Sequence, residues 1–432
     1  MRKTLRSLIF CWLSSMTLLA TSAADSVEWP QWRGPEQNGV APQGTFPTEW
    51  SSDSGLAWKV DLPGRGGSTP VIAEGVAYLT AGIDGKNTLL AISLEDGKEV
   101  WRASLGNDTG GKHKKGSGSN PSAIVDGDSI FAYFRSGDLA SVNTQGKTNW
   151  AINLQERFGE DTLWWDLGSS PTVTDDAVIV AVMQSGPSYL VALDKKTGDV
   201  KWKTDRMLGA PEEAAQSYST PLHVSIDGSP MLAVMGADHI TVHDAKMGKE
   251  LGRLGGFNPD QEQYFRSISS PVAQGNIVVC PYARGATLTA VRLDDLSQGK
   301  GDQAIAWFRD DLGSDVPTPA AHNGRLYVVS DGRQSRGTVS CLDLESGKTV
   351  WTQRLPRSRV SFSSSPLVAG NHLYVTQEDG TTFVLGPLDA NEPQVIAANA
   401  IDDKNPYTVA SLVPLDGGFL LRSRGQLYRI GK

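Results

Sequence analysis

Residues Leu90–Trp101 read LAISLEDGKEVW, and residues Leu190–Trp202 read LVALDKKTGDVKW. Both stretches consist of a short apolar run, a polar turn that contains one glycine, and a tryptophan four residues after that glycine. The same offset recurs at Gly146–Trp150 and Gly347–Trp351. Four occurrences of one spacing indicate that the chain is built from a repeated structural unit.

A second signal, a Ser-Pro or Thr-Pro dipeptide, marks the beginning of most units. Successive dipeptides are about 50 residues apart, which is the length of one four-stranded propeller blade. Asn120-Pro121 and Ser411-Leu412 fill the two remaining places in the series, so we predict eight units. The dipeptides themselves are Thr69-Pro70, Ser170-Pro171, Thr220-Pro221, Ser270-Pro271, Thr318-Pro319 and Ser365-Pro366.

The residues after each dipeptide read as strands. Val71–Thr80 holds two apolar runs around Glu74-Gly75, which predicts a tight hairpin. A third run, such as Tyr189–Leu193, leads into the glycine turn, and the tryptophan strand follows. Proline fits the first residue of a strand, because no ladder hydrogen bond is lost there. The predicted fold class is therefore all-β, an eight-bladed β-propeller of four-stranded antiparallel blades.

The eighth unit lacks its last strand. It stops after Gln426–Ile430, and no tryptophan strand follows. A strand of that type stands at the other end of the chain, at Leu56–Val60. We predict that this N-terminal strand completes the eighth blade, because closure of the ring removes the exposed edges of an open sheet.

The repeated tryptophans are interpreted as structural. An indole on an outer strand buries about 150 to 250 Å² when it docks against the next blade. Gly252 stands where the fourth unit would carry its tryptophan, and the seventh unit offers only Val395-Ile396. The predicted docking residues are Trp58, Trp101, Trp150, Trp202, Trp307 and Trp351.

The N-terminal region predicts export. Basic residues precede an apolar stretch and a run of small residues, so residues 1–24 are expected to be a signal peptide. Residues 25–55 would be an extension and residues 56–432 the propeller. Cys11 lies inside the apolar stretch, which argues against a lipid anchor, and no segment approaches the length of a membrane helix. We expect a periplasmic or extracellular monomer.

The charge of the mature chain argues against one class of partner. Removal of residues 1–24 takes away three basic residues and leaves 48 acidic and 37 basic ones, a net charge of about −11. A nucleic-acid binder would present a basic face, so no nucleic-acid partner is expected. Cys280 and Cys341 stand in apolar runs and are predicted to be buried free thiols.

The unit from Leu90 to Trp101 resembles the repeat of pyrroloquinoline-quinone (PQQ) dehydrogenases and of BamB-like propellers of outer-membrane barrel assembly. Trp29–Gly39, which reads WPQWRGPEQNG, is similar to the opening of exported BamB-like proteins of planctomycetes. The dehydrogenases hold PQQ against two adjacent disulfide-bonded cysteines, with Ca²⁺ beside it, whereas this sequence has no adjacent cysteine pair. The resemblance therefore implies a non-catalytic scaffold without a cofactor. The alternative is a PQQ- and Ca²⁺-dependent dehydrogenase that oxidises an alcohol or a sugar.

Loops that link successive blades, and turns between the second and third strands, should gather on one face around the channel mouth. Arginine and aromatic residues there would suit a protein partner or a small anionic ligand. Two structural interpretations stay open: the arginines pair with acids of the same loops, and Trp164-Trp165 is packing. No catalytic or metal-binding residue is predicted. The candidate binding residues are Arg65, His113, Lys115, Trp164, Trp165, Asp166, Arg266, Arg284, Arg336 and Arg359.

Overall fold

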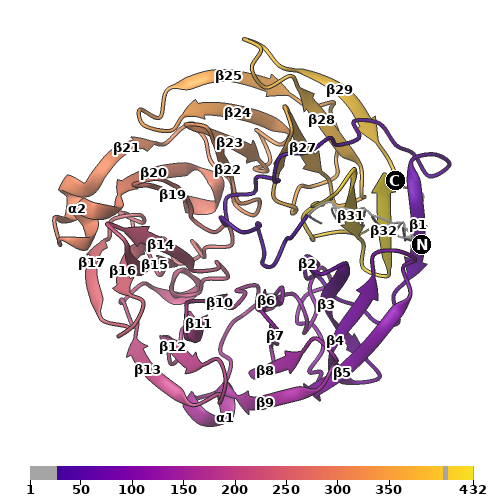
Figure 1. Cartoon of the computed structure of the whole chain (residues 1–432). Coiled ribbons are helices and arrows are strands. Elements are labelled where there is room, and N and C mark those ends of the chain that lie inside the picture. Colours follow the sequence, from indigo (N-terminus) through magenta and orange to yellow (C-terminus); the bar gives the residue numbers. More distant parts are fainter. Residues whose placement is uncertain (1–26, 402–406, 432) are drawn as a thin grey trace, which may run out of the picture.

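Eight four-stranded antiparallel sheets stand in a ring around one axis in the computed structural model of the protein (Figure 1). The structure describes residues 27–401 and 407–431. It confirms the predicted eight-bladed β-propeller and its four-stranded blades. The predicted signal peptide, residues 1–24, lies outside the described residues.

Each blade takes its strands from one sequence unit, except the eighth, which also takes the first strand of the chain. The first blade contains β2 (Val71–Ala73), β3 (Val76–Ile83), β4 (Lys86–Ser93) and β5 (Glu99–Asn107); the second contains β6 (Ile124–Asp126), β7 (Ser129–Tyr133), β8 (Asp138–Asn143) and β9 (Thr148–Asn153). The third contains β10 (Thr172–Val173), β11 (Ala177–Val182), β12 (Tyr189–Asp194) and β13 (Val200–Asp205); the fourth contains β14 (Leu222–Ile226), β15 (Ser229–Gly236), β16 (His239–Asp244) and β17 (Glu250–Leu254). The fifth contains β18 (Val272–Gln274), β19 (Ile277–Tyr282), β20 (Thr287–Arg292) and β21 (Ile305–Arg309); the sixth contains β22 (Ala320–His322), β23 (Arg325–Ser330), β24 (Thr338–Asp343) and β25 (Thr349–Arg354). The seventh contains β26 (Leu367–Ala369), β27 (His372–Thr376), β28 (Thr382–Gly386) and β29 (Gln394–Asn399); the eighth contains β30 (Val413–Leu415), β31 (Gly418–Arg422), β32 (Gln426–Gly431) and β1 (Leu56–Asp61).

The helices of the described ranges are short, and none could cross a bilayer. They are α1 (Leu154–Phe158), α2 (Leu293–Ser297) and the 3-10 turns η1 (Glu212–Ala215), η2 (Ala283–Gly285) and η3 (Gly301–Ala304).

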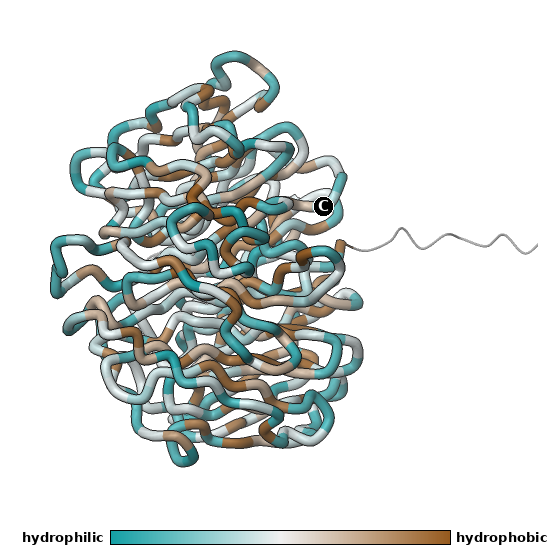
Figure 2. The backbone as a smooth tube through the Cα atoms, turned by 90° about the vertical axis from the view of Figure 1, so that its left-hand side faces the viewer, coloured by the Kyte–Doolittle hydropathy of each residue, from teal (hydrophilic) through white to brown (hydrophobic). Residues whose placement is uncertain are grey.

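Burial differs between the inner and the outer strands of a blade. In the third blade, β11 and β12 are buried along nearly their whole length, whereas the outermost strand β13 alternates between half-buried and exposed residues. A strand with neighbouring blades on both faces needs apolar residues on both, while a rim strand shows one side to water. Seen from the side, hydrophobic segments run through the interior of the ring and the protruding turns are hydrophilic (Figure 2).

The repeated tryptophans dock one blade onto the next. The Trp101 indole lies over Gly146 of the second blade and donates its N–H to the carbonyl of Thr144 at 2.8 Å. Gly146 has a φ of +83°, and a Cβ there would meet the indole, so both the turn and the contact require glycine. Trp58, Trp150 and Trp307 make the same bond, with N–H to carbonyl distances of 2.8 to 2.9 Å.

Two positions depart from this docking pattern. Trp202 lies over Gly248, but its indole N–H has no acceptor among the described residues. In the fourth blade Gly252 pairs with Val242, the position that corresponds to Trp202 in the third blade. A Cβ on Gly252 would collide with the carbonyl of Leu296, so helix α2 occupies the place of the tryptophan.

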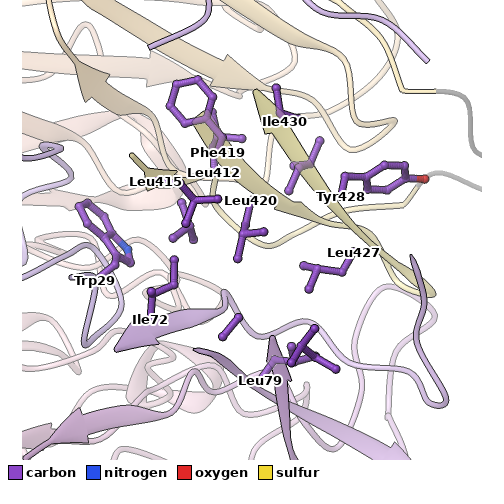
Figure 3. Close-up of a cluster of buried hydrophobic side chains, with 14 of the residues drawn as sticks. Trp29, Ile72, Leu79, Leu412, Leu415, Phe419, Leu420, Leu427, Tyr428 and Ile430 are labelled. Carbon is purple, nitrogen blue, oxygen red and sulfur yellow. The ribbon is translucent and has the colours of Figure 1, made fainter. Parts of the chain in front are cut away.

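The ring is closed by β1, which pairs antiparallel with β32 from Leu56 to Asp61. Arg422 of β31 is fully buried and donates to the carbonyls of Ser68 and Thr80, each at 2.9 Å, so it ties the eighth blade to the first. Side chains of both blades form one hydrophobic cluster with Trp29 (Figure 3). The predicted closure by an N-terminal strand agrees with this pairing.

The segment 29–41, named here the plug segment, crosses the centre of the ring (Figure 1). Its backbone bonds to inner strands of four blades, at Ile72, Val125, Ala321 and Val368, with N–H to oxygen distances of 2.8 to 3.1 Å. The Gln37 side chain donates to the hydroxyl of Thr172 in the third blade and accepts the backbone N–H of His223 in the fourth. The plug segment therefore binds the inner strands of six blades.

Arg33 anchors the plug segment. Its guanidinium is buried and donates to the carbonyl of Pro366 at 2.7 Å and to the carbonyl of Pro319. Burial lowers the pKa of Arg33 to about 9. Each bond reaches a different blade, so one side chain fixes the segment against the sixth and seventh blades.

Candidate functional site

A cavity of about 760 Å³ lies on the axis of the ring. Trp32 of the plug segment lines its inner end, and loops between blades line its walls. Eight of the cavity-lining residues each stand two positions before an innermost strand, while the plug segment bonds to residues within those strands. The cavity therefore lies on the loop side of the ring, with the plug segment beneath it. Its volume is within the range of about 300 to 1,000 Å³ of small-molecule sites.

Eight hydroxyl residues circle the wall of the cavity. The backbone N–H of each donates to the hydroxyl oxygen of the corresponding residue in the next blade, at 2.9 to 3.1 Å. The last bond runs from Ser411 to Thr69 and closes the circle. We call this ring the hydroxyl belt; its members are Thr69, Ser122, Ser170, Thr220, Ser270, Thr318, Ser365 and Ser411.

The belt corrects the alignment of the second unit. The dipeptide series assigned Asn120-Pro121 to this place, whereas Ser122 is the residue that accepts the N–H of Thr69. A hydroxyl oxygen is needed at the belt position, and the proline is not. Asn120 instead accepts hydrogen bonds from Ser117 through its side-chain oxygen.

Three exposed aromatic side chains stand on the cavity wall: Trp164, Trp165 and Tyr264. They are 44%, 42% and 53% exposed, respectively. The Trp164 and Tyr264 ring centroids are 6.3 Å apart. The Trp165 indole donates to Glu213 at 2.6 Å and meets His113 edge-on at 5.3 Å. Trp164 and Trp165 are thus held in place from one side and remain open to solvent on the other.

Two of the candidate cations are paired with acids. Arg266 makes two 3.0 Å hydrogen bonds to the carboxylate of Asp315, and its Nε lies 3.7 Å from Glu213. Lys115 reaches both carboxylate oxygens of Glu378, at 2.8 and 2.9 Å. Both cations are therefore paired, but with acids of other loops: Asp315 belongs to the linker after the one that carries Arg266. The Arg266 side chain is only 10% exposed.

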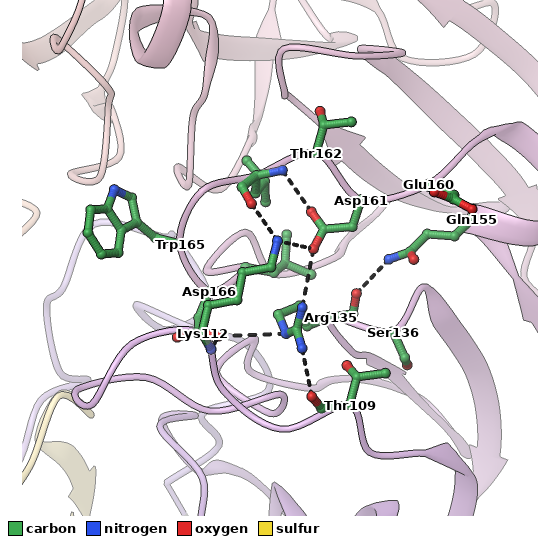
Figure 4. Close-up of polar contacts among 12 residues, drawn as sticks. Thr109, Lys112, Arg135, Ser136, Gln155, Glu160, Asp161, Thr162, Trp165 and Asp166 are labelled. Atoms are coloured by element: carbon green, nitrogen blue, oxygen red, sulfur yellow. Dashed lines mark hydrogen bonds and ion pairs between the residues drawn. The ribbon is translucent and has the colours of Figure 1, made fainter.

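Asp166 fixes the loop that carries His113 (Figure 4). Its carboxylate accepts the backbone N–H groups of Lys112 at 2.6 Å and His113 at 2.9 Å, and it lies 3.6 Å from Nε of Arg135. Arg135 also reaches Asp161 at 3.4 Å. Trp165 points away from this polar cluster in Figure 4. Asp166 is buried, and its oxygens accept hydrogen bonds from the loop backbone, so its role is to hold the loop in place.

Asp331 is a largely buried carboxyl on the cavity wall. Burial raises its pKa to about 6, against the effect of the backbone N–H groups of Asp315 and Val316, which donate to it at 2.8 and 3.0 Å. Its charge therefore changes in the mildly acidic range.

Seven of the ten sequence-predicted binding residues line the cavity, and three do not. The seven are His113, Lys115, Trp164, Trp165, Asp166, Arg266 and Arg284. Arg65 is exposed beside a small neighbouring pocket, and Arg336 donates to the carbonyl of Arg359, which is exposed. The linkers between the first and second, the second and third, and the fourth and fifth blades bring six of the seven together, and Arg284 joins them from the turn between β19 and β20. The other three arginines lie away from the cavity lining.

Sequence reasoning missed Trp32, the hydroxyl belt, Phe362 and Tyr407, all of which line the cavity. The belt had a signal in the repeated Ser-Pro and Thr-Pro dipeptides, but these were interpreted only as strand starts. Trp32 stood in the quoted WPQWRGPEQNG stretch, which carried no assignment to the site.

The residues do not fit the PQQ and Ca²⁺ site of the quinoprotein enzymes. Cys280 and Cys341 are buried free thiols in separate blades, as predicted, and neither lines the cavity. Among residues 27–401 and 407–431, no group of three His, Cys, Asp or Glu side chains could hold a metal ion. This part of the chain therefore offers neither an adjacent cysteine pair for the quinone nor a cluster of three such side chains for the cation.

A protein-family model described as outer membrane protein assembly factor BamB matches residues 48–205, 161–300 and 296–393. BamB from Moraxella catarrhalis is 15% identical, covers 87% of this chain and 99% of its own, and gives a TM-score of 0.62. Quinohemoprotein alcohol dehydrogenase from Comamonas testosteroni is 13% identical over 94% of this chain and 80% of its own, with a TM-score of 0.67. A europium-containing methanol dehydrogenase is 13% identical over 94% and 89%, with a TM-score of 0.65. No curated protein matches the sequence significantly. These structural likenesses concern the fold alone.

Proposed function

The chain belongs to the family of the outer membrane protein assembly factor BamB, and from that premise we propose that it is a non-catalytic binding propeller. It holds a protein partner or a ligand at the mouth of its axial cavity. It acts outside the cytoplasm, in the periplasm or the extracellular space, as the signal-like sequence of residues 1–24 suggests.

The observation that carries the proposal is the exposed aromatic group on the wall of the cavity. Trp164, Trp165 and Tyr264 are large, solvent-accessible and held in place by neighbouring side chains. Tryptophan and tyrosine dominate binding hot spots, because they bury much surface at a low cost in side-chain entropy. Together with the cavity, they form a concave site that is partly lined by aromatic side chains, and ligand sites are usually concave and rich in aromatic residues.

The dehydrogenase alternative lacks a supporting observation at the site. The cavity residues offer neither an adjacent cysteine pair nor, in the described ranges, a set of metal ligands. We therefore derive no oxidation step. Saturable, chelator-sensitive oxidation of alcohols or sugars after addition of PQQ and Ca²⁺ would reverse this ranking.

The proposal is tested by affinity capture from the cell envelope with the wild type and two single variants. Trp164→Ala removes an exposed side chain of the cavity wall, and Phe308→Ala removes a comparably exposed aromatic residue from the outer strand β21. Loss of a hot-spot residue costs about 2 kcal/mol or more of binding, so the Trp164 variant should retain about thirtyfold less of what the wild type binds. The Phe308 variant should bind as the wild type does.

Arg266 is unsuitable as a probe of this surface. Its removal would leave Asp315 and Glu213 without their cation, so a loss of binding could follow from a loss of structure. Equal retention by the Trp164 and Phe308 variants, with unchanged far-UV circular dichroism, would place the binding surface elsewhere.

A further inference from the structure

The hydroxyl belt offers a cavity wall of uncharged hydrogen-bonding groups. Each of its eight oxygens accepts one backbone N–H, and no protein acceptor for the hydroxyl protons is found among the described residues. A hydroxyl has one proton and two lone pairs, so each belt residue keeps a donor and one lone pair for a ligand. The belt therefore suits a ligand that is itself both donor and acceptor at many points.

The charges on the cavity wall do not favour an anion. Three cationic side chains, Lys115, Arg266 and Arg284, share the wall with four carboxyl groups. Lys115 and Arg266 are neutralised by their acidic partners, and Arg284 donates to the carbonyl of Tyr264 at 3.0 Å. An anionic ligand would meet Glu213, Asp331 and Glu378 on the same wall. These near-balanced charges favour a neutral ligand.

Flat apolar surfaces occur both at the inner end of the cavity and toward its open side. Trp32 is half-buried at the inner end, and Trp164, Trp165 and Tyr264 are exposed on the wall. A pyranose has an apolar face of C–H groups and a rim of hydroxyls, so it can pack on an aromatic ring while its rim is hydrogen-bonded. A peptide would find few free strand edges to pair with, because the plug segment already bonds to the inner strands of six of the eight blades.

Building on the proposed function, we propose that the ligand is the end of a neutral glycan chain. It enters past the exposed aromatic side chains, hydrogen-bonds to the hydroxyl belt and packs its terminal ring on Trp32. The carboxylates of Glu378 and Asp331 accept hydrogen bonds from sugar hydroxyls at the wall.

The test is isothermal titration of the full mature chain with neutral tetrasaccharides of gluco, galacto, manno and xylo configuration. The matching oligouronic acids and inorganic phosphate serve as anionic probes. At least one neutral tetrasaccharide should bind, and the anions should bind more weakly. Trp32→Ala should weaken binding about tenfold or more, since a hot-spot aromatic is lost, while Trp32→Phe keeps a ring and most of the affinity.

A matched pair in the belt separates the effect of the hydroxyl group from that of the shape of the side chain. Thr220→Val keeps the shape of the side chain and removes its hydroxyl, whereas Thr220→Ser keeps the hydroxyl. Affinity for the neutral sugar should fall about fivefold to tenfold in the valine variant and stay near that of the wild type in the serine variant.

The outcomes distinguish this inference from the proposed function. If no neutral tetrasaccharide binds but Trp164-dependent capture persists, the glycan proposal is wrong and the binding propeller stands. Tighter binding of the oligouronic acids or of phosphate would also overturn it, in favour of an anionic ligand. If neither capture nor titration detects binding, both proposals fall.

Discussion

Replacement of Trp150 and of Trp202 by phenylalanine tests the tryptophan docking between blades. Both indoles lie over the turn glycine of the next blade, at Gly198 and Gly248. Only Trp150 makes the N–H bond, to the carbonyl of Lys195 at 2.9 Å, whereas the N–H of Trp202 has no partner among the described residues. The two substitutions therefore remove the same ring area and differ by one hydrogen bond.

The magnitude follows from that difference. A lost hydrogen bond contributes about 0.5 to 1.5 kcal/mol, and an unsatisfied buried group costs about 1 to 3 kcal/mol. Trp150→Phe should therefore lower the free energy of unfolding by about 1 to 2 kcal/mol more than Trp202→Phe. Replacement of Trp202 by alanine, which also empties the docking site, should cost about 3 to 5 kcal/mol.

The free energies are measured by urea unfolding followed by far-UV circular dichroism, a signal that the loss of one tryptophan barely changes. Midpoints are compared at equal m-values, so that a change in midpoint reports stability alone. If the two phenylalanine variants are equally stable, the indole hydrogen bond does not hold adjacent blades together, and only the buried area matters.

Two further predictions concern buried polar groups. Arg33→Met should lower the free energy of unfolding by about 2 to 3 kcal/mol, because hydrogen bonds from a charged donor are lost. Arg65→Met, at an exposed position, should change it by less than about 0.5 kcal/mol. Urea unfolding of the two variants, measured side by side, tests this difference. Burial, with a further contribution from Arg206, lowers the pKa of His243 in the folded protein to about 4. As the pH falls from about 6.5 to 4, the unfolded chain therefore binds a proton at this residue before the folded protein does. Stability should fall by about 3 kcal/mol across that window, and His243→Gln should flatten the urea midpoints between pH 7 and pH 5; an unchanged slope would contradict the assignment.

The fold could be predicted because its information is local and repeated. The offset from Gly97 to Trp101 recurs, and at Trp101, Trp150 and Trp202 it brings the indole to the turn glycine of the next blade. Closure could also be predicted, since the missing strand of the last unit matched Leu56–Val60 in type. Local spacing failed in the second unit, where Ser122 and not the proline dipeptide holds the belt position.

The plug segment could not be placed from the sequence. Arg33 bonds to Pro319 and Pro366, which are 286 and 333 residues away, and no local pattern joins them. The ion pair of Arg266 could not be predicted either, because its partner Asp315 lies 49 residues away in the next linker. The sequence suggested that the Arg266 charge was free to bind a ligand, whereas Asp315 neutralises it in the structure. Trp164 and Trp165 could be identified because they fall outside the repeated offset.

Site-specific photo-crosslinking in the intact cell envelope locates the surface through which the protein binds. A benzophenone side chain is placed at position 164 on the cavity wall or, as a control, at position 247, in the turn between β16 and β17. Met247 is 72% exposed, so both sites are accessible, but only Trp164 lines the cavity. We expect a discrete adduct from position 164 and none from position 247. An adduct from position 247 alone, or equal adducts from both, would contradict a binding site at the cavity mouth.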